Sequence, residues 1–169
     1  MDECRRIREM DVSQYIRRAW REVDNRRQLI EIDWLEPDFP NGYENHLANL
    51  ENTIRSDGIA LGAFSESRLV GYCTVNPEFF GDISRYMLLD QLFIDRGFRG
   101  KGIGRALFMQ AAARARARGA DKLYICAGSS EDTVAFYIAI GCQEAAEVNQ
   151  ALYGMDRRDL QMEYDCTGR

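Results

Sequence analysis

The stretch RGFRGKGIG, residues 96–104, lies between an apolar run and a strongly helical pattern. It contains four glycines, and three of them occupy alternate positions: Gly100, Gly102 and Gly104. The basic residues Arg99 and Lys101 lie beside them. Glycine weakens regular structure, but it permits positive φ angles and a close approach to the backbone. The first N–H groups of a helix lack intrahelical partners and favour negative charge. The stretch therefore predicts a pyrophosphate site between a strand and a helix.

Two common phosphate-binding patterns do not fit this stretch. The P-loop pattern is absent because Lys101 is followed by Gly102 rather than by serine or threonine. The dinucleotide pattern G-x-G-x-x-G is absent because the third glycine, Gly104, comes too early. The remaining alternative is a glycine-rich turn with exposed basic residues.

The spacing of apolar residues predicts strands and helices in mixed order. Alternation in IALGAF and RLVGYCTV, on either side of SESR, predicts a β-hairpin. The other predicted elements are a strand at 5–10, helices at 12 to about 30 and at 43–56, a strand at 85–95, a helix over 104–118, a strand at 122–128, a helix within 129–141, and weaker strands at 142–148 and 159–165.

The predicted order implies one domain with a mixed sheet. Strand, helix and strand over 85–128 imply a parallel pair with a crossover helix, while the hairpin implies antiparallel pairing. Helices on the sheet faces make the class α/β or α+β. A chain of 169 residues is the size of one domain, so we expect a single domain over 1–169 with its core at about 5–165.

Composition argues against several classes of partner. The five cysteines form no CxxC pair and the chain has one histidine, so we expect no metal site and free thiols in the cytoplasm. No apolar run approaches 18 residues, and the net charge is −5, so we expect neither membrane nor nucleic-acid binding. The run RARAR at 114–118 is interpreted as a solvated helix face, with a nucleic-acid patch as the alternative.

Two segments together resemble a known family. LFIDRGFRGKGIGRALF, residues 92–108, resembles the acyl-CoA-binding motif of the GNAT superfamily of N-acetyltransferases. SSEDTVAFYIAIGC, residues 129–142, is similar to the family's later helix and turn. The resemblance covers roughly 5–165. The chain departs from the family pattern at Ser130, Thr133 and Cys142, where Asn, Ala and Phe are commoner.

The resemblance implies a central-splayed sheet of about six to seven strands with about four helices, and acetyl-CoA as cosubstrate. It implies that the pyrophosphate binds over 99–105 and that the pantetheine arm pairs with a strand end. The cofactor-binding residues carried over are Leu92, Phe93, Ile94, Arg99, Gly100, Lys101, Gly102, Ile103, Gly104, Arg105, Ser130 and Tyr137.

The resemblance also implies direct attack of an amine on the thioester, without an acyl-enzyme. Tyr137 matches the tyrosine that can protonate the leaving thiolate; a buried tyrosine with a satisfied hydroxyl is the alternative. Asp90 is the candidate base, because a charge within the apolar strand MLLDQLFI is costly to bury without a purpose. Its alternative is an ordinary charge at a strand edge.

The acceptor is expected to be the primary amine of a small molecule. Residues 31–44 carry five acidic and no basic residues, interleaved with aromatics, so a cationic amine would suit them; a solvated acidic loop is the alternative. The other functions considered are a non-catalytic acyl-CoA-binding module, an acetyltransferase acting on protein or peptide amines, and a nucleotide- or phosphate-binding protein that would bind ATP in place of CoA. A homodimer is expected from the resemblance only.

Overall fold

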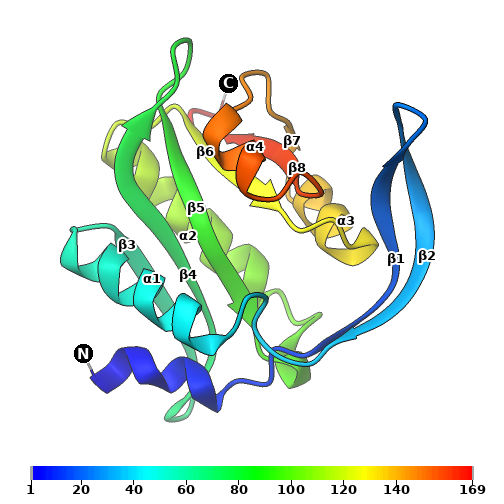
Figure 1. Ribbon diagram of the computed structural model, residues 1–169. Coiled ribbons are helices and arrows are strands. Elements are labelled where there is room, and N and C mark those ends of the chain that lie inside the picture. Colours follow the sequence, from blue (N-terminus) through cyan, green and yellow to red (C-terminus); the bar gives the residue numbers. More distant parts are fainter. Residues whose placement is uncertain (1, 169) are drawn as a thin grey trace.

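The computed structural model describes residues 2–168 and contains a six-stranded mixed sheet, with a separate two-stranded hairpin beside it (Figure 1). The strand order in the large sheet is β3-β4-β5-β6-β8-β7. Only β5 and β6 are parallel; the other neighbours are antiparallel. The strands are β3 (Ile59–Ser65), β4 (Arg68–Phe80), β5 (Tyr86–Ile94), β6 (Lys122–Ala127), β7 (Gln143–Glu144) and β8 (Leu160–Asp165).

Helices cover both faces of this sheet. On one face α2 (Ile103–Ala117) and α3 (Glu131–Ala139) pack over the larger apolar core (Figure 1). On the other face the 3-10 helix η1 (Asp2–Glu9) and α1 (Tyr43–Arg55) cover a smaller core. Two short elements, η2 (Arg96–Phe98) and α4 (Gln150–Met155), complete the chain. The predicted class, a mixed sheet with about four helices, is confirmed.

The N-terminal prediction is wrong. The segment predicted as a helix from residue 12 to about 30 forms a hairpin of β1 (Gln14–Val23) and β2 (Arg26–Glu36), and the predicted strand at 5–10 lies largely within η1. The turn explains the difference. Asp24 and Asn25 have φ angles of 50° and 59°, which are the left-handed values of a tight two-residue hairpin turn. The apolar spacing fits a helix, but this turn fixes two strands.

The hairpin is held to the main body along one strand. The backbone N–H of Trp20 donates to the carbonyl of Ser129 at 2.8 Å, and the Trp20 side chain packs against the larger core. Arg18 and Glu131 form a bidentate ion pair, with N–O distances of 2.8 and 2.6 Å. Contacts with α3 therefore stabilise β1 as a strand.

Other elements lie close to their expected positions. The helix predicted at 43–56, the hairpin around SESR, and the strand–helix–strand unit over 85–128 are all present. The strand expected at 142–148 has only two residues, and α4 was not predicted. No helix among residues 2–168 is long and apolar enough to cross a membrane.

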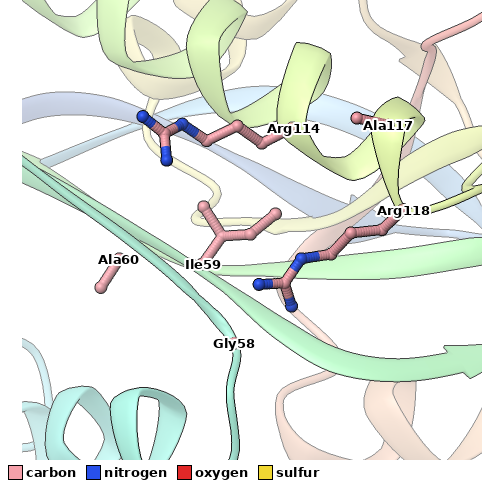
Figure 2. A pocket seen from close by; sticks show the side chains of 6 residues that line it. All are labelled: Gly58, Ile59, Ala60, Arg114, Ala117 and Arg118. Atoms are coloured by element: carbon pink, nitrogen blue, oxygen red, sulfur yellow. The ribbon is translucent and has the colours of Figure 1, made fainter.

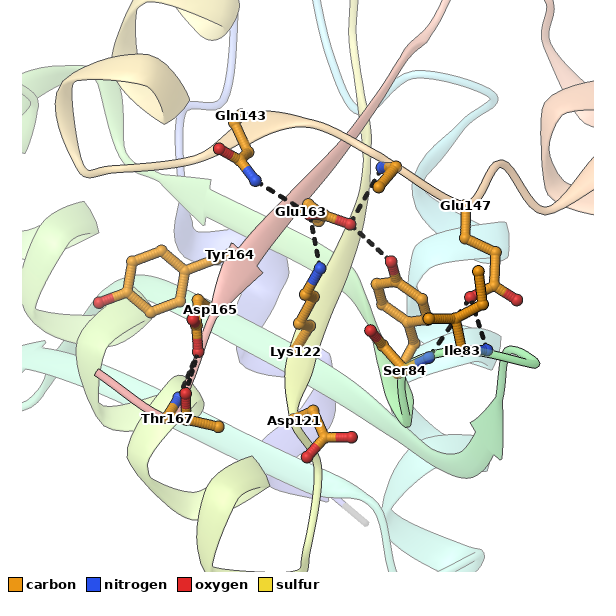
Figure 3. Close-up of polar contacts among 12 residues, drawn as sticks. Ile83, Ser84, Asp121, Lys122, Gln143, Glu147, Glu163, Tyr164, Asp165 and Thr167 are labelled. Atoms are coloured by element: carbon orange, nitrogen blue, oxygen red, sulfur yellow. Dashed lines mark hydrogen bonds and ion pairs between the residues drawn. The ribbon is translucent and has the colours of Figure 1, made fainter. Parts of the chain in front are cut away.

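A buried carboxylate joins β6, β7 and β8 (Figure 3). Glu163 is 1% exposed and accepts hydrogen bonds from Lys122 Nζ at 2.7 Å, Tyr86 Oη at 2.5 Å and Gln143 Nε2 at 3.1 Å. The backbone N–H of Ala146 is a fourth donor, at 3.1 Å. Burial alone would raise the pKa of Glu163, but these donors outweigh it and lower the pKa to about 2.

Candidate active site

The glycine-rich loop opens directly at the start of α2. Gly102 is the N-cap residue, with φ 82° and ψ 0°, and no side chain caps this helix end. Gly100 also has a positive φ, 74°, and a Cβ built at either glycine would meet no atom within 4 Å. The space above the loop is therefore open, and the backbone conformation requires glycine.

The backbone N–H groups of this loop are available to a ligand. The first intrahelical bond of α2 runs from Ala106 N–H to the Gly102 carbonyl, so the three preceding N–H groups have no helical acceptor. Within residues 2–168, the N–H groups of Gly100, Lys101 and Gly102 also have no acceptor. A run of unbonded N–H groups at a helix N-terminus is suited to an anion such as a pyrophosphate.

The basic side chains around the loop have different surroundings. Arg99 donates to three backbone carbonyls, those of Ile94, Val12 and Ser13, at 2.9–3.1 Å. It therefore ties the start of the hairpin to the end of β5, and its side chain is engaged in the fold. Lys101 lies over the Phe98 ring, 4.7 Å from its centroid, with its ammonium exposed beside the open loop.

The parallel pairing of β5 with β6 stops before β5 ends. The last pair is Leu89 with Ile125, whereas β5 continues to Ile94 (Figure 1). At this point β5 also contains a bulge: Thr74 of β4 pairs with Gln91 and Val75 pairs with Leu89, which leaves Asp90 as the extra residue. Bulges re-aim side chains and end pairing, and they are common next to active sites.

Three elements meet where β5 separates from β6. A Cβ at Gly104 of α2 would lie 3.4 Å from the Phe136 ring of α3 and 3.5 Å from the Ile94 side chain of β5. Leu92 and Ile94 both pack against the larger core. The structure thus brings the predicted loop, the strand end and α3 together.

Tyr137 of α3 lies at this junction with a buried side chain. Its ring contacts those of Phe108 and Phe136, with centroids 6.2 and 5.2 Å apart. Its hydroxyl makes no hydrogen bond within residues 2–168, and the fully buried polar side-chain atom without a partner in that range is Thr74 Oγ1, so the Tyr137 hydroxyl keeps some access to solvent. Burial raises the pKa of Tyr137, which keeps the phenol protonated.

Ser130 is the N-cap of α3. Its Oγ accepts from the Thr133 N–H at 3.2 Å and from Gln14 Nε2 of the hairpin at 3.2 Å. It also donates to Thr133 Oγ1 at 2.7 Å. The two residues that depart from the family pattern on α3, Ser130 and Thr133, therefore bond each other.

A second group of polar residues lies beside the bulge. Burial raises the pKa of Asp90, while the Gln91 amide, 3.4 Å away, and His46 lower it. Burial also raises the pKa of Asp159, to about 6, and Asp156 adds to this. Burial, Asp159 and Asp90 raise the pKa of the Cys126 thiol to about 12. Two partly buried carboxylates thus lie within electrostatic reach of one thiol.

A family model matches the chain. The model of the acetyltransferase (GNAT) family covers residues 18–141. The chain belongs to the GNAT family. Members of this family are acetyltransferases that use acetyl-CoA as the acetyl donor, so this chain is an acetyl-CoA-dependent N-acyltransferase. The open glycine loop of α2 and the unbonded N–H groups fit that cosubstrate.

Solved structures share the GNAT fold. A nourseothricin acetyltransferase is 20% identical, with TM-score 0.68, over 93% of this chain and 89% of that one. An aminoglycoside 6'-N-acetyltransferase complexed with coenzyme A is 16% identical, with TM-score 0.60, over 76% and 84%. A GNAT acetyltransferase from Elizabethkingia anophelis with acetyl-CoA bound is 14% identical, with TM-score 0.54, over 70% and 82%. No curated protein sequence matches the chain.

Two residues near the GNAT site were missed from the sequence. Asp159 precedes β8, and Cys126 is close to the end of β6, so both lie beside the site only because β6 and β8 are neighbours. The only local sequence feature that pointed to Asp159 was a charged run, DRRD, immediately before an apolar strand. Such runs are usual in loops, which is why this one was not singled out.

The acidic segment 31–44 is not gathered into a single lining. Glu31 and Asp33 lie on β2 and bond residues of β1, namely Arg17 at 3.3 Å and the Tyr15 hydroxyl at 2.6 Å. Phe39 is buried in the smaller core, and Glu44 pairs with Arg8 at 3.5 Å. The candidate acidic lining closest to the site is therefore Asp90 with Asp159.

A depression of about 320 Å³ lies elsewhere, between β3 and the C-terminal end of α2. Figure 2 shows the side chains of Arg114 and Arg118 extending toward Ile59, while Arg116 does not line it. It lies at the opposite end of α2 from Gly102, so it is separate from the GNAT site. Its six lining residues contain no group suited to proton transfer at neutral pH: Gly58, Ile59, Ala60, Arg114, Ala117 and Arg118.

Proposed function

We propose that this single-domain chain, 1–169, transfers the acetyl group of acetyl-CoA to a primary amine of a small cationic molecule. The amine attacks the thioester directly, and no acyl-enzyme forms. The observation that carries the proposal is the open loop at Gly100 and Gly102, with unbonded N–H groups, beside the end of β5 that extends beyond its pairing with β6.

Cofactor binding rests mainly on the backbone. The N–H groups from Gly100 to Arg105 would hold the pyrophosphate, with Lys101 adding charge from its exposed position. The Arg99 side chain stabilises the loop through its hydrogen bonds to three backbone carbonyls. The free edge of β5 at Leu92, Phe93 and Ile94 offers main-chain groups to the pantetheine arm. Bound acetyl-CoA supplies the thioester.

Tyr137 is proposed as the general acid. Its hydroxyl is protonated and makes no hydrogen bond within residues 2–168, so it holds a proton for the leaving sulfur. A thiolate expelled into an apolar site needs such a donor, because a buried charge without a partner is costly. Ser130 anchors the start of the same helix and keeps Tyr137 in position.

Asp90 is proposed as the base, directly or through water. Its raised pKa makes the carboxylate a better proton acceptor than an exposed aspartate. The bulge at this residue removes it from regular pairing, next to the point where β5 leaves β6. The side-chain Oε1 of the neighbouring Gln91 accepts from the Tyr72 hydroxyl of β4 at 2.6 Å.

The cationic character of the acceptor is proposed from two carboxylates. Neither Asp90 nor Asp159 forms an ion pair within the described part of the chain, although burial raises the pKa of both. A ligand ammonium would stabilise both charged forms. Neighbours named for small-molecule antibiotics, nourseothricin and aminoglycosides, agree with a small acceptor. The proposal also places the enzyme in the cytoplasm, because all five cysteines are free thiols.

The test is release of CoA thiol with a panel of amines. The panel pairs small polycations, such as polyamines and aminoglycosides, with neutral primary amines of similar size and with a lysine peptide. We expect turnover with a small polycation and at least about tenfold lower kcat/KM with its neutral partner. Preference for the lysine peptide would instead favour a protein or peptide acetyltransferase. Acetyl-CoA binding without any thiol release would favour the non-catalytic module.

A further inference from the structure

Asp90 and its neighbour Gln91 lie on the same face of the large sheet. Side chains of a regular strand alternate between the two faces, so Leu89 and Leu92 would point to opposite faces. Both of these leucines instead pack against the larger core. The bulge in β5 accounts for the change, and it turns Asp90 and Gln91 together toward the face that α1 covers.

The Gln91 side chain is 2% exposed, and its neighbours fix the orientation of its amide. Nε2 lies 3.3 Å from the backbone carbonyl of His46, a group that can only accept, so the amide nitrogen must face it. The same nitrogen lies 3.4 Å from Asp90 Oδ2, and the amide oxygen accepts from the Tyr72 hydroxyl at 2.6 Å. The amide therefore presents a fixed donor to one oxygen of the Asp90 carboxylate.

The His46 ring completes this network from α1. Its Nε2 lies 2.7 Å from the backbone carbonyl of Pro40, so Nε2 carries a proton. Its Nδ1 lies 3.4 Å from the Gln91 amide oxygen, to which a proton on Nδ1 would be donated. The rings of Phe39 and Phe93 contact the imidazole, with centroids 5.0 and 4.9 Å away. Packing and hydrogen bonds thus hold His46 beside the Gln91 amide.

Two other ionisable groups near Asp90 stay neutral while its carboxyl group titrates. Burial raises the pKa of the Tyr72 phenol of β4, and the charge of Asp90 adds to this. Burial, Asp159 and Asp90 raise the pKa of the Cys126 thiol of β6 to about 12. His46 of α1 is a charged group that acts on Asp90.

We propose that Gln91 is a positioning residue for acetyl transfer, whose amide orients the Asp90 carboxylate and is itself held by His46 and Tyr72. For its effect on turnover, the inference rests on the proposed role of Asp90 as the base. Burial raises the pKa of Asp90, and the Gln91 amide and the charge of His46 oppose this. The network therefore keeps the carboxylate ready to accept a proton, because a donor to the charged form stabilises that form.

The experiment follows the Asp90 carboxyl group by NMR in protein that contains isotope-labelled aspartate, with Asp90→Asn identifying its signal. We expect the pKa of Asp90 to rise by about one pH unit in Gln91→Met and by a smaller amount in His46→Gln. Kinetics use acetyl-CoA and the polyamine or aminoglycoside with the highest kcat/KM. The acid limb of the pH profile of kcat/KM should move with the Asp90 pKa. In Gln91→Met kcat should also fall by about tenfold, because the carboxylate is no longer oriented.

Gln161→Met is the matched control, because Gln161 is also buried and accepts from a tyrosine hydroxyl, that of Tyr124 at 2.8 Å. It should leave the pKa of Asp90 unchanged. An Asp90 pKa that moves in neither Gln91→Met nor His46→Gln would overturn the inference, as would an equal rise in Gln161→Met. The His46 side chain is only partly buried, so His46→Gln decides if Gln91→Met fails to fold. A raised Asp90 pKa with an unmoved rate profile would support the network and contradict the role of Asp90 as base.

Discussion

Tyr137 and Tyr164 make a natural comparison, because both rings contact Phe108 from the same core. The Tyr164 hydroxyl lies 3.4 Å from the sulfur of Met109, whereas that of Tyr137 has no partner within residues 2–168. The Tyr137 hydroxyl can therefore donate to a bound group without first losing a hydrogen bond within the described part of the protein. It becomes useful if a bound group accepts its hydrogen bond, as a thioester sulfur would.

Replacement of Tyr137 by phenylalanine should therefore slow turnover more than it weakens binding. We expect kcat to fall by about 100-fold, the lower end of the usual contribution of a general acid. Acetyl-CoA affinity, measured by calorimetry, should stay within about twofold. Tyr164→Phe is the matched control and should keep kcat. Equal kcat for both variants would assign Tyr137 to packing alone.

Asp159 predicts a pH dependence of acceptor binding. Its pKa of about 6 lies above the usual aspartate value because of burial and Asp156, so the group gains a proton as pH falls through 6. The neutral acid no longer attracts an ammonium. We expect the KM of a cationic acceptor to rise by about tenfold between pH 7 and pH 5, while the KM of acetyl-CoA changes little.

The Asp159→Asn variant checks the origin of this effect. It should show the high acceptor KM already at pH 7, with a flatter profile toward acid. A profile unchanged from that of the wild type would place the titrating group elsewhere. The same raised pKa favours folding at low pH: the fold binds this proton more tightly than the unfolded chain, so this stability is lost as pH rises from about 4 to 6.

At the scale of elements, sequence patterns located the glycine loop, α2 and the hairpin around SESR because each has a local cause. The wrong prediction of an N-terminal helix also has a local cause. Apolar residues such as Val12, Ile16 and Ala19 recur at helical spacing, but contacts with Ser129 and Ser130 fix this segment as a strand. Asp24 and Asn25 are residue types that favour a turn, but they lie within a segment whose apolar spacing fits a helix. The bulge at Asp90 had no local sign, because it depends on the register with β4.

The network around Glu163 is an element-scale contribution to stability. Substitution by glutamine keeps the shape but leaves the largely buried Lys122 ammonium without its charge partner. We expect Glu163→Gln to lower the free energy of unfolding by on the order of 3 kcal/mol, measured by urea denaturation at pH 7. The pKa of Glu163 is lowered to about 2, so its contribution should be present above pH 4 and decline toward pH 2.

Glu144→Gln is the control for this network. Glu144 lies on the neighbouring strand, and its pair with Arg27 is exposed, so the change should cost less than about 1 kcal/mol. Similar losses from the two substitutions would contradict a special role for the buried carboxylate.

Glu147 ties the loop before β5 to the segment before α4, since it accepts from the backbone N–H groups of Ile83 and Ser84 (Figure 3).

At the scale of the whole molecule, the proposed site is assembled from segments far apart in the chain. The loop before α2, the free end of β5, Tyr137 on α3 and Asp159 before β8 converge because the sheet order places β5, β6 and β8 side by side. Motifs predicted the first three segments. The fourth follows from the antiparallel pairing of β6 with β8. The sequence predicted β8 only as a weak strand.

Calorimetric titration of acetyl-CoA into the wild type and Gly102→Glu is the most direct test of the central claim, that the α2 loop binds the cosubstrate. Gly42→Glu is the matched control, because Gly42 also has a positive φ and open space around it. We expect tight binding by the wild type and the control, weaker binding of ATP, and a loss of about 100-fold in Gly102→Glu. Unchanged acetyl-CoA affinity in a folded Gly102→Glu protein, or binding of ATP in preference to acetyl-CoA, would contradict it.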